Sequence, residues 1–496
     1  MTHTNEVRVL PRKVKSVAII GGGASGAIAL DSLIKEEKFE KIVLFERRDV
    51  LGGVWVLDHK PDQLDVPPGF TQDQLDPKVK IPKDFQNAKD VTKLPRTQQQ
   101  RYLHTASYED LRTNIPEQLM TYSDEKTWGA DEKLYVDGHY IRGVAIRDYI
   151  DRYINRHRDH VVLRTTVEDI TKDYSTSDTQ FELTLRTETD EKDNDGNYID
   201  HWRKESFDSV VIATGHYHVP SIPKVPGLDE VYHRFPSKVK HSKTFRANDD
   251  FKDQTIIVIG SRASGADIVD ITSKDAKFVY QSRRSKGPLR FDGAENTTLK
   301  PVITKYELVN DQDIIVHFAD GTTVENPDQI IYATGFRFSY PFLKDLYPNF
   351  TTGYINPDLY LHTFSIKDPL LSLIGVPTDA ISFRAFEYQA VLVSRFLAGK
   401  VVLPPLNEQL QWTLQRFIEK GDQRAYHTID FGKKHEFLNL LTSIGGGVEP
   451  IGQTGRPFPT WTEDDLQLLL SIEERFKKFF GEGEANDFKN STIKQE

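Results

Sequence analysis

The sequence predicts an α/β protein that contains two Rossmann-like domains, the second inserted into the first. Two observations predict this fold class. A short β-branched strand, a glycine-rich turn and an apolar helical pattern follow one another from Ser16, and the same succession recurs from Thr255. The triplet Ala-Thr-Gly also occurs at 213–215 and 333–335, each time directly after an apolar run. At 496 residues the chain is too long for one compact core, so two domains are expected.

The repeated triplets predict where the chain enters and leaves the inserted domain. We therefore assign residues 1–218 and 333–496 to a discontinuous first domain and residues 219–332 to the inserted one. The segment 58–100, rich in Pro, Asp, Lys and Gln, is expected to run over the surface outside the core. The other expected elements are strands at 16–20, 41–45, 161–163, 181–185, 210–212, 256–259, 278–280 and 330–332, helices at 144–153 and 466–480, and an exposed hairpin tip at 188–198.

The composition excludes several classes of function. The 64 basic and 74 acidic residues give a net charge of −10 that is spread along the chain, which argues against a nucleic-acid partner. No apolar run reaches the length of a membrane span, and the run at 17–20 is too short for a signal-peptide core, so we expect a cytoplasmic protein. The chain has no cysteine, which excludes disulfides, iron–sulfur clusters and thiol nucleophiles. We expect no metal site.

The first glycine-rich turn has the spacing of a dinucleotide site. Gly21 permits a sharp turn, Gly23 lets the backbone approach a pyrophosphate, and Gly26 allows the helix to pack closely on the strand. Ala24 and Ser25 open the helix, whose N-terminal N–H groups and partial positive charge favour a phosphate. With a strand before it and a helix and second strand after it, this turn is predicted to bind a dinucleotide.

The second glycine-rich turn repeats the pattern with one departure. Gly260 and Gly265 occupy the outer glycine positions and Ser264 precedes the last one, but Arg262 replaces the middle glycine. Its side chain needs room where a pyrophosphate should pass. Two arrangements are open: the side chain turns outward and neutralises the phosphate, or the loop is looser than in the first unit.

The strand ends predict which nucleotide each turn binds. Glu46 lies 20 residues beyond the last glycine of the first turn, where a carboxylate accepts hydrogen bonds from ribose hydroxyls and repels a 2′-phosphate. This residue favours FAD or NAD. The second unit instead places Arg283 and Arg284 after its strand, and a guanidinium suits a 2′-phosphate. The second turn is therefore predicted to bind NADPH.

Five further segments occur in an order found in one known family. They are Leu51-Gly52-Gly53-Val54-Trp55, Tyr108 with Leu111-Arg112-Thr113-Asn114, Phe235-x-Ser237-x-x-x-His241-x-x-x-Phe245, Ile331-Tyr332-Ala333-Thr334-Gly335-Phe336, and Glu387-Tyr388-Gln389-Ala390. The sequence resembles the flavin-containing monooxygenases, most closely their fungal members, between residues 15 and 400. One departure is Ser237, which stands where the family fingerprint has glycine.

The resemblance implies an enzyme that uses FAD, NADPH and O2. In that family NADPH reduces the flavin, and O2 adds to it to form a C4a-hydroperoxyflavin that oxygenates a soft nucleophile, either an amine nitrogen or a thiol or sulfide sulfur. The cofactor carries the difficult chemistry, and the protein supplies a dry pocket and hydrogen bonds. The implied partners are a small-molecule nucleophile and O2, and a homodimer is left open.

The resemblance also assigns roles to single residues. Asn114 matches the active-site asparagine of the family, whose amide donates to the flavin–oxygen adduct without delivering a proton. Gly53 and Trp55 match a flavin-binding motif, while His104 and Gln389 are expected to contact the flavin side. His241 is expected to have a structural or NADPH-gating role rather than to act as a base.

Alternative functions remain at this point. A flavin disulfide reductase shares the architecture but passes electrons through a cysteine pair, which this chain lacks. A Baeyer–Villiger monooxygenase acting on ketones usually has Trp followed by Pro or Asp where this chain has Phe245-Arg246. A nucleotide-binding flavoprotein sensor without turnover is a third alternative. A simple flavin oxidase needs no second nucleotide site.

Overall fold

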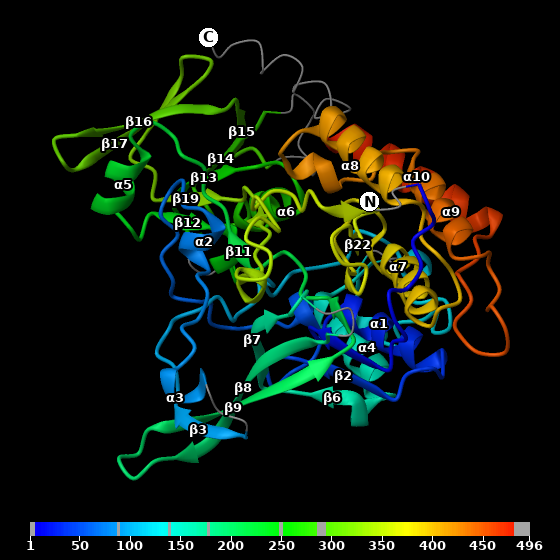
Figure 1. Ribbon diagram of the computed structural model, residues 1–496. Coiled ribbons are helices and arrows are strands. Elements are labelled where there is room, and N and C mark those ends of the chain that lie inside the picture. The colour runs from blue at the N-terminus through cyan, green and yellow to red at the C-terminus, as the bar shows by residue number, and fades with distance from the viewer. Residues whose placement is uncertain are drawn as a thin grey trace.

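The computed structural model describes residues 5–86, 90–136, 140–175, 179–247, 251–284 and 294–480. Its larger sheet has seven strands, and the five from β23 to β6 run parallel to one another. Figure 1 labels β22, β2 and β6 of this sheet. In sheet order the seven strands are β21 (Leu359–Tyr360), β22 (Phe364–Ser365), β23 (Leu371–Leu373), β10 (Ser209–Ile212), β1 (Ser16–Ile20), β2 (Lys41–Phe45) and β6 (Val161–Val162).

The core of this half forms around β1, whose five residues are all buried because helices and strands cover both of its faces. Helix α1 (Ala24–Lys35) follows β1 and packs on α4 (Gly143–Asn155) and on α7 (Ser382–Leu397). The predicted strands at 16–20 and 41–45 and the predicted helix at 144–153 are confirmed.

A second, five-stranded sheet is parallel throughout. Helix α6 (Ala263–Thr272) packs on its strands β13 and β14, as α1 packs on β1 and β2. The chain therefore repeats the strand–turn–helix–strand unit in three dimensions. The sheet order is β12 (Val239–His241), β19 (Gln329–Tyr332), β13 (Thr255–Ile259), β14 (Phe278–Ser282) and β15 (Thr297–Lys300).

The chain leaves the larger sheet after β10 and returns to it at β21. On the way out it forms β11 (Val219–Pro220) and on the way back β20 (Phe336–Arg337), and these two short strands pair antiparallel. Both Rossmann-like units are thus present, with the second one lying within the sequence of the first. The exact boundaries, 218/219 and 332/333, stay a prediction.

Smaller sheets extend from both halves. The hairpin predicted at 188–198 is confirmed, but its turn is shorter than predicted and spans only residues 193–197. The strands β8 (Phe181–Lys192) and β9 (Tyr198–Phe207) include the other residues of that segment, and β8 is longer than the predicted strand 181–185. A four-stranded antiparallel sheet has the order β3 (Thr92–Pro95), β9, β8 and β7 (Thr165–Thr171). A three-stranded sheet comprises β16 (Ile303–Val309), β17 (Asp313–Phe318) and β18 (Thr323–Glu325). Strand β4 (Tyr135–Val136) pairs with β5 (Tyr140–Ile141).

The prediction that segment 58–100 lies outside the core is wrong in part. Val66 joins the apolar core beneath the second sheet, and Val79 and Phe85 form a buried cluster with Trp202 of β9. These few apolar residues are far apart in a polar stretch, so only their tertiary partners reveal that they are buried. The segment contains β3 and the short helices α2 (Gln72–Leu75) and α3 (Lys83–Gln86).

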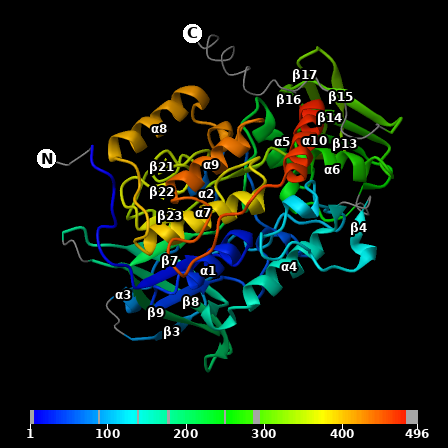
Figure 2. The same ribbon diagram turned by 90° about the vertical axis from the view of Figure 1, so that its right-hand side faces the viewer.

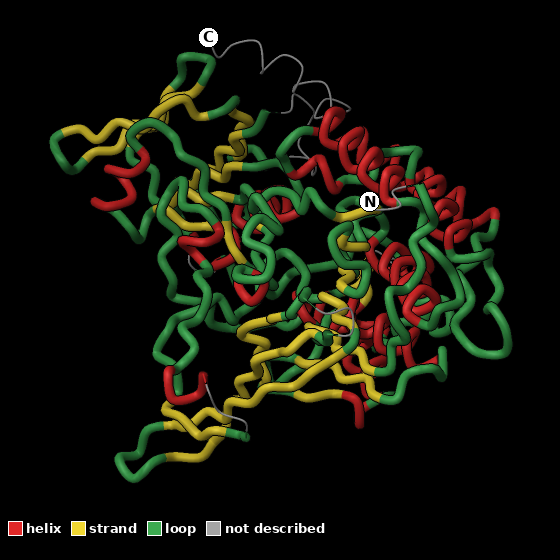
Figure 3. Tube along the Cα trace, viewed as in Figure 1, coloured by secondary structure: helices red, strands yellow, loops and turns green. Residues whose placement is uncertain are grey.

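The C-terminal part of the chain is mainly helical (Figures 2 and 3). Helix α9 packs on α7, while α10 packs on the 3-10 helix at Glu117–Leu119, and the predicted helix at 466–480 is confirmed. Across the described ranges we find no helix with the length and apolar character needed to cross a membrane. The remaining helices are α5 (Leu228–Arg234), α8 (Leu406–Lys420), α9 (Lys434–Ile444) and α10 (Glu463–Phe480).

Candidate functional site

The first glycine-rich turn forms a tight loop between β1 and α1 that leaves no room for side chains. A Cβ atom at Gly26 would lie 1.9 Å from the carbonyl oxygen of Gly21, and one at Gly21 would lie 2.6 Å from that of Ala213. Gly23 is the N-cap of α1 and provides no side-chain cap, and the first turn has no acidic residue. The free N–H groups of this turn therefore suit a phosphate, and the loop fits a dinucleotide.

Glu46 is held beside this loop at the end of β2. One oxygen of its carboxylate accepts a hydrogen bond from the N–H of Gly22 at 2.7 Å, and the other accepts one from the N–H of Arg48 at 2.9 Å. The side chain is buried, and each oxygen keeps a second lone pair. This orientation supports the predicted ribose contact, which stays a prediction.

The Gly-Gly-x-Trp segment docks directly on the glycine loop. The N–H of Gly52 donates to the carbonyl of Gly22 at 3.0 Å, and a Cβ atom at Gly53 would lie 2.9 Å from the Cα of Gly23. The two motifs, separate in the sequence, thus form one surface through glycine-to-glycine backbone contact. Trp55 ends the short 3-10 helix Gly53–Trp55, next to α4.

Gln389 on α7 does not face an open space. Its side-chain oxygen accepts from the N–H of Gly375 at 3.1 Å, and its amide donates to the hydroxyl of Thr363 at 2.8 Å. Gly375 in turn packs on Ser25, because a Cβ atom there would lie 2.2 Å from the Ser25 hydroxyl oxygen. Gln389 therefore fixes the loop after β23 against the start of α1, and direct flavin contact by it stays a prediction.

The second glycine-rich turn repeats the geometry of the first. A Cβ atom at Gly265 would lie 2.5 Å from the carbonyl oxygen of Gly260, and one at Gly260 would lie 2.4 Å from that of Ala333. Ala333 thus has the same relation to this loop as Ala213 has to the first. Both Ala-Thr-Gly triplets pack on the first glycine of a loop, which is the physical reason for their repetition. Ser264 lies in the first turn of α6.

Arg262 turns away from its loop and crosses to the other half of the molecule. Its Nη1 lies 2.7 Å from Oδ2 of Asp379, between β23 and α7, and both side chains are about one-third exposed, at 34% and 35%. Of the two predicted arrangements, the outward side chain is the one observed, but a carboxylate rather than a phosphate neutralises it. The loop remains tight.

Arg283 and Arg284 directly follow β14, next to the second glycine loop. The N–H of Gly260 donates to the carbonyl of Ser282 at 2.9 Å, so the loop and the arginine pair start from neighbouring strand ends. Arg283 is buried, which lowers its pKa, whereas Arg284 is exposed. Arg284 is therefore the better placed of the two to reach a bound nucleotide.

His241 is fully occupied by backbone partners. Its Nε2 lies 2.9 Å from the carbonyl oxygen of Gly335, and its Nδ1 accepts from the N–H of Lys243 at 3.1 Å, so the proton is on Nε2. Burial lowers the pKa of His241 to about 3. An imidazole that is neutral and has both nitrogens in hydrogen bonds is unsuited to act as a base. It fixes the loop of the second triplet instead.

His104 lies at the contact between segment 58–100 and the fingerprint segment. Its N–H donates to Asp62 at 3.1 Å, and its carbonyl accepts from the ammonium group of Lys243. Both hydrogen bonds fix the backbone of His104, and its imidazole Nδ1 lies 3.3 Å from Oδ1 of the same Asp62. The flavin contact expected of the His104 ring stays a prediction.

Asn114 lies on a short segment that is linked to the first glycine loop through α4. Gly143 at the start of α4 is packed between Leu111 and Trp55, each of which would come within 3.3 Å of a Cβ atom there. Next to Asn114, the N–H of Thr113 donates to the carbonyl of Ile141 at 2.9 Å. Within the described residues the side-chain amide of Asn114 has no hydrogen-bond partner, so it is available to a bound group.

A pocket joins the two triplets and was not predicted from the sequence. Both His216 and Arg424 line this pocket. Burial is the main cause that lowers the pKa of His216 to about 3, and the positive charge of Arg424 contributes, so the imidazole of His216 is neutral. Because several of the lining residues directly follow a triplet, the triplets themselves could have located the pocket. It is lined by His216, Tyr217, Gly335, Phe336, Phe338, Tyr354, Thr378 and Arg424.

Two glycine loops that follow parallel strands in two sheets, one beside a carboxylate and the other beside arginines, are the arrangement of an oxidoreductase that uses two dinucleotides. Comparison with known proteins agrees. The family described as "Flavin-binding monooxygenase-like" matches residues 75–290 and 293–445. The chain belongs to this family of flavin-containing monooxygenases, and it is an enzyme that uses FAD and NADPH.

Individual relatives are similar over most of the chain. "Flavin-containing monooxygenase FMO GS-OX5" of Arabidopsis thaliana is 31% identical and the match covers 92% of this chain and 94% of that protein. "Flavin-containing monooxygenase iboF" of Amanita muscaria is 29% identical over 89% of this chain and 90% of the relative, so the predicted fungal resemblance is confirmed. The solved S-allyl-L-cysteine S-oxygenase of Allium sativum has the same fold, with a TM-score of 0.69, 23% identity and 97% of both chains covered.

Replacing Arg284 with alanine is expected to raise the KM for NADPH about tenfold and to leave the KM for NADH unchanged, because one charge-assisted bond to the 2′-phosphate is lost. Steady-state NADPH and NADH oxidation measures both values. Arg234→Ala, which removes an exposed charge at the end of α5, is the control and should change neither. Equal loss with both nucleotides would contradict the assignment of Arg284.

Proposed function

We propose that this enzyme uses NADPH and O2 to oxygenate a soft nucleophile, either an amine nitrogen or a thiol or sulfide sulfur. The observation that carries the proposal is the unpartnered side-chain amide of Asn114, within the described residues, on a segment joined through Gly143 to Trp55 and the first glycine loop. An amide donates a hydrogen bond but has no acidic proton to release. It therefore suits a site that must stabilise activated oxygen without discharging it as peroxide.

The residues around the two loops have complementary tasks in this proposal. Glu46 and the first loop hold FAD, and the second loop with Arg284 holds NADPH. Bound FAD, once reduced, supplies the activation of O2. The pocket lined by Tyr217, Phe336 and neutral His216 presents mainly aromatic surface where the chain continues from the two triplets, and such a surface excludes water from a reactive centre.

Oxygenation of ketones is the less favoured alternative. Arg246, which stands after Phe245 where the Baeyer–Villiger fingerprint usually has Pro or Asp, donates to the carbonyls of Asp58, Thr105 and Lys243. It thereby binds the fingerprint segment to segment 58–100. A role in ketone chemistry would require it to leave these partners.

The test is Asn114→Ala in FAD-loaded enzyme. We expect NADPH oxidation to continue while the product formed per NADPH falls about tenfold and peroxide rises correspondingly, because one hydrogen bond to the reacting group is lost. Product and peroxide are assayed in parallel with a tertiary amine, a thiol, a thioether and a cyclic ketone. Asn155→Ala at the exposed end of α4 is the control. Unchanged coupling in Asn114→Ala, or turnover of the ketone alone, would refute the proposal.

A further inference from the structure

The C-terminal helix α10 contacts the segment that carries Asn114, although the family match ends at residue 445. Arg475 of α10 donates from Nη2 to the backbone carbonyl of Asn114 at 3.1 Å. Its other nitrogen, Nη1, is hydrogen-bonded to the hydroxyl of Tyr140, and its guanidinium lies 5.1 Å from the centre of that ring. One guanidinium thus joins α10, β5 and the Asn114 segment.

Apolar contacts press the same helix against the same segment. Leu469 and Ile472 of α10 form a buried cluster with Leu119 and Ile381, and Ile115 packs against it. Ile115 directly follows Asn114, and Ile381 is the N-cap of α7. The backbone on the C-terminal side of Asn114 is therefore covered by α10.

Helix α10 is itself fixed at the turn that carries Arg475. The ammonium group of Lys434 at the start of α9 lies 2.5 Å from the carboxylate of Glu473, and both side chains are only 6% exposed. The other oxygen of Glu473 accepts from the N–H of Gly432 at 3.0 Å. Because Glu473 is two residues before Arg475, this anchor limits movement of the guanidinium.

These contacts bracket Asn114. On its N-terminal side Thr113 is bound to Ile141, and on its C-terminal side the carbonyl of Pro116 accepts from Leu119 and Met120. Between these points the carbonyl of Asn114 is bound by Arg475. A planar guanidinium holds a carbonyl with a charge-assisted and directional bond, which fixes the peptide plane and with it the direction of the adjacent side chain.

We propose that Arg475 is a positioning residue for the oxygenation reaction: through the Asn114 carbonyl, it holds the Asn114 amide in its working orientation. The proposal rests on the proposed function of Asn114. It gives the C-terminal helix a role in coupling NADPH oxidation to substrate oxygenation, rather than in binding either nucleotide.

The experiment compares Arg475→Met, which keeps the aliphatic stem, with Arg475→Lys, which keeps a charged donor, and with the control Glu474→Gln on the exposed side of α10. Product per NADPH should fall about threefold to tenfold in Arg475→Met, the loss expected for one charge-assisted hydrogen bond, and recover in part in Arg475→Lys, with FAD content and the KM for NADPH unchanged. Hydrogen exchange of the amides at 113–120 should accelerate in Arg475→Met even without cofactors. Glu474→Gln should behave as wild type in all four measurements.

A double-mutant cycle separates the two proposals. In an Asn114→Ala background, Arg475→Met should cause no further loss of coupling, because both changes act through one amide. Additive losses, or normal coupling in Arg475→Met, would overturn the role of Arg475 while leaving that of Asn114 intact. Normal coupling in Asn114→Ala would instead remove the proposed role of Asn114. If Arg475→Met does not fold, the folded Arg475→Lys variant decides through its coupling and exchange.

Discussion

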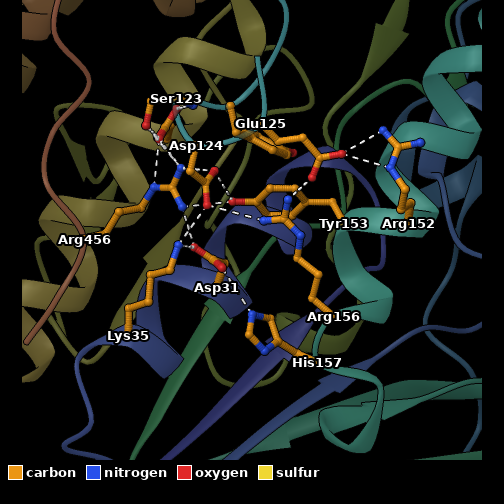
Figure 4. A network of polar contacts seen from close by, with 12 residues as sticks. Asp31, Lys35, Ser123, Asp124, Glu125, Arg152, Tyr153, Arg156, His157 and Arg456 are labelled. Carbon is orange, nitrogen blue, oxygen red and sulfur yellow. Dashed lines mark hydrogen bonds and ion pairs between the residues drawn. The ribbon is translucent and has the colours of Figure 1, made fainter. Parts of the chain in front are cut away.

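Replacing Arg456 with methionine is expected to lower the free energy of unfolding by about 3–5 kcal/mol. The change leaves the buried carboxylate of Glu387 without its cation and removes one of the cations that pair with Asp31 and Asp124. The Arg456 side chain is only 2% exposed, and it pairs with Asp31 and Asp124 (Figure 4). It also pairs with Glu387. Its Nη1 also donates to the hydroxyl of Tyr153 at 2.9 Å. The loss should appear as a lower urea midpoint, followed by intrinsic fluorescence.

The matched control is Arg152→Met in the same network. Arg152 pairs with Glu125 at 2.7 Å, but its side chain is 45% exposed, so the loss should be at most about 1 kcal/mol. Equal losses in the two variants would show that burial of Arg456 does not determine its contribution.

The effect of Arg456 is expected to depend on pH. Burial acts to raise the pKa of Asp31 and Asp124, but hydrogen bonds and the charge of Arg456 hold both pKa values below the ordinary range. A depressed carboxyl pKa stabilises the fold above the unfolded pKa of about 3.9, and this stabilisation is lost as the pH falls below it. The difference between wild type and Arg456→Met should therefore begin to shrink as the pH falls below about 5 and continue to shrink below the unfolded pKa, towards the depressed folded pKa values of the two carboxyl groups.

Gly26→Ala is expected to weaken FAD binding at least about hundredfold, because the new methyl group would lie 1.9 Å from the carbonyl of Gly21 and the loop must open. Gly265→Ala is the matched variant in the second loop, where the new methyl group would lie 2.5 Å from the carbonyl oxygen of Gly260. It should keep its flavin absorbance but lose NADPH affinity.

Flavin content after gel filtration and an anaerobic NADPH titration of flavin absorbance measure these two effects. Far-ultraviolet circular dichroism establishes that each variant is folded. A folded Gly26→Ala protein with a full complement of FAD would show that the first loop is not the flavin cradle. Loss of flavin in Gly265→Ala would show that the loops do not act separately.

Strands and turns that depend on local sequence were predicted accurately. The strand Ser16–Ile20, the strand Lys41–Phe45 and both glycine loops lie where the pattern of apolar residues and glycines placed them. Steric exclusion at a glycine acts within a few residues, so spacing alone reports it. The triplet at 213–215 is evident in the sequence as a repeat, but its packing on the first glycine of the loop depends on the strand register.

The partners of the charged residues could not be predicted in this way. The sequence marks Arg262 as an obstacle to a pyrophosphate, yet its carboxylate partner Asp379 is 117 residues away. Likewise, Arg475 binds the backbone of Asn114, which is 361 residues away in the sequence. Such pairs form only after the sheets and helices have packed, and no local pattern marks them.

The sequence by itself determined three things about this protein: the presence of two dinucleotide loops, the family to which the protein belongs and the cofactors that it uses. Only the tertiary structure decided that Arg262 is neutralised across the two halves, that His241 is held neutral by the backbone, and that α10 reaches the Asn114 segment. The physical reason is the range of the forces involved. Backbone sterics and periodic burial are written into neighbouring residues, whereas ion pairs and hydrogen bonds between distant segments depend on the complete packing of the chain.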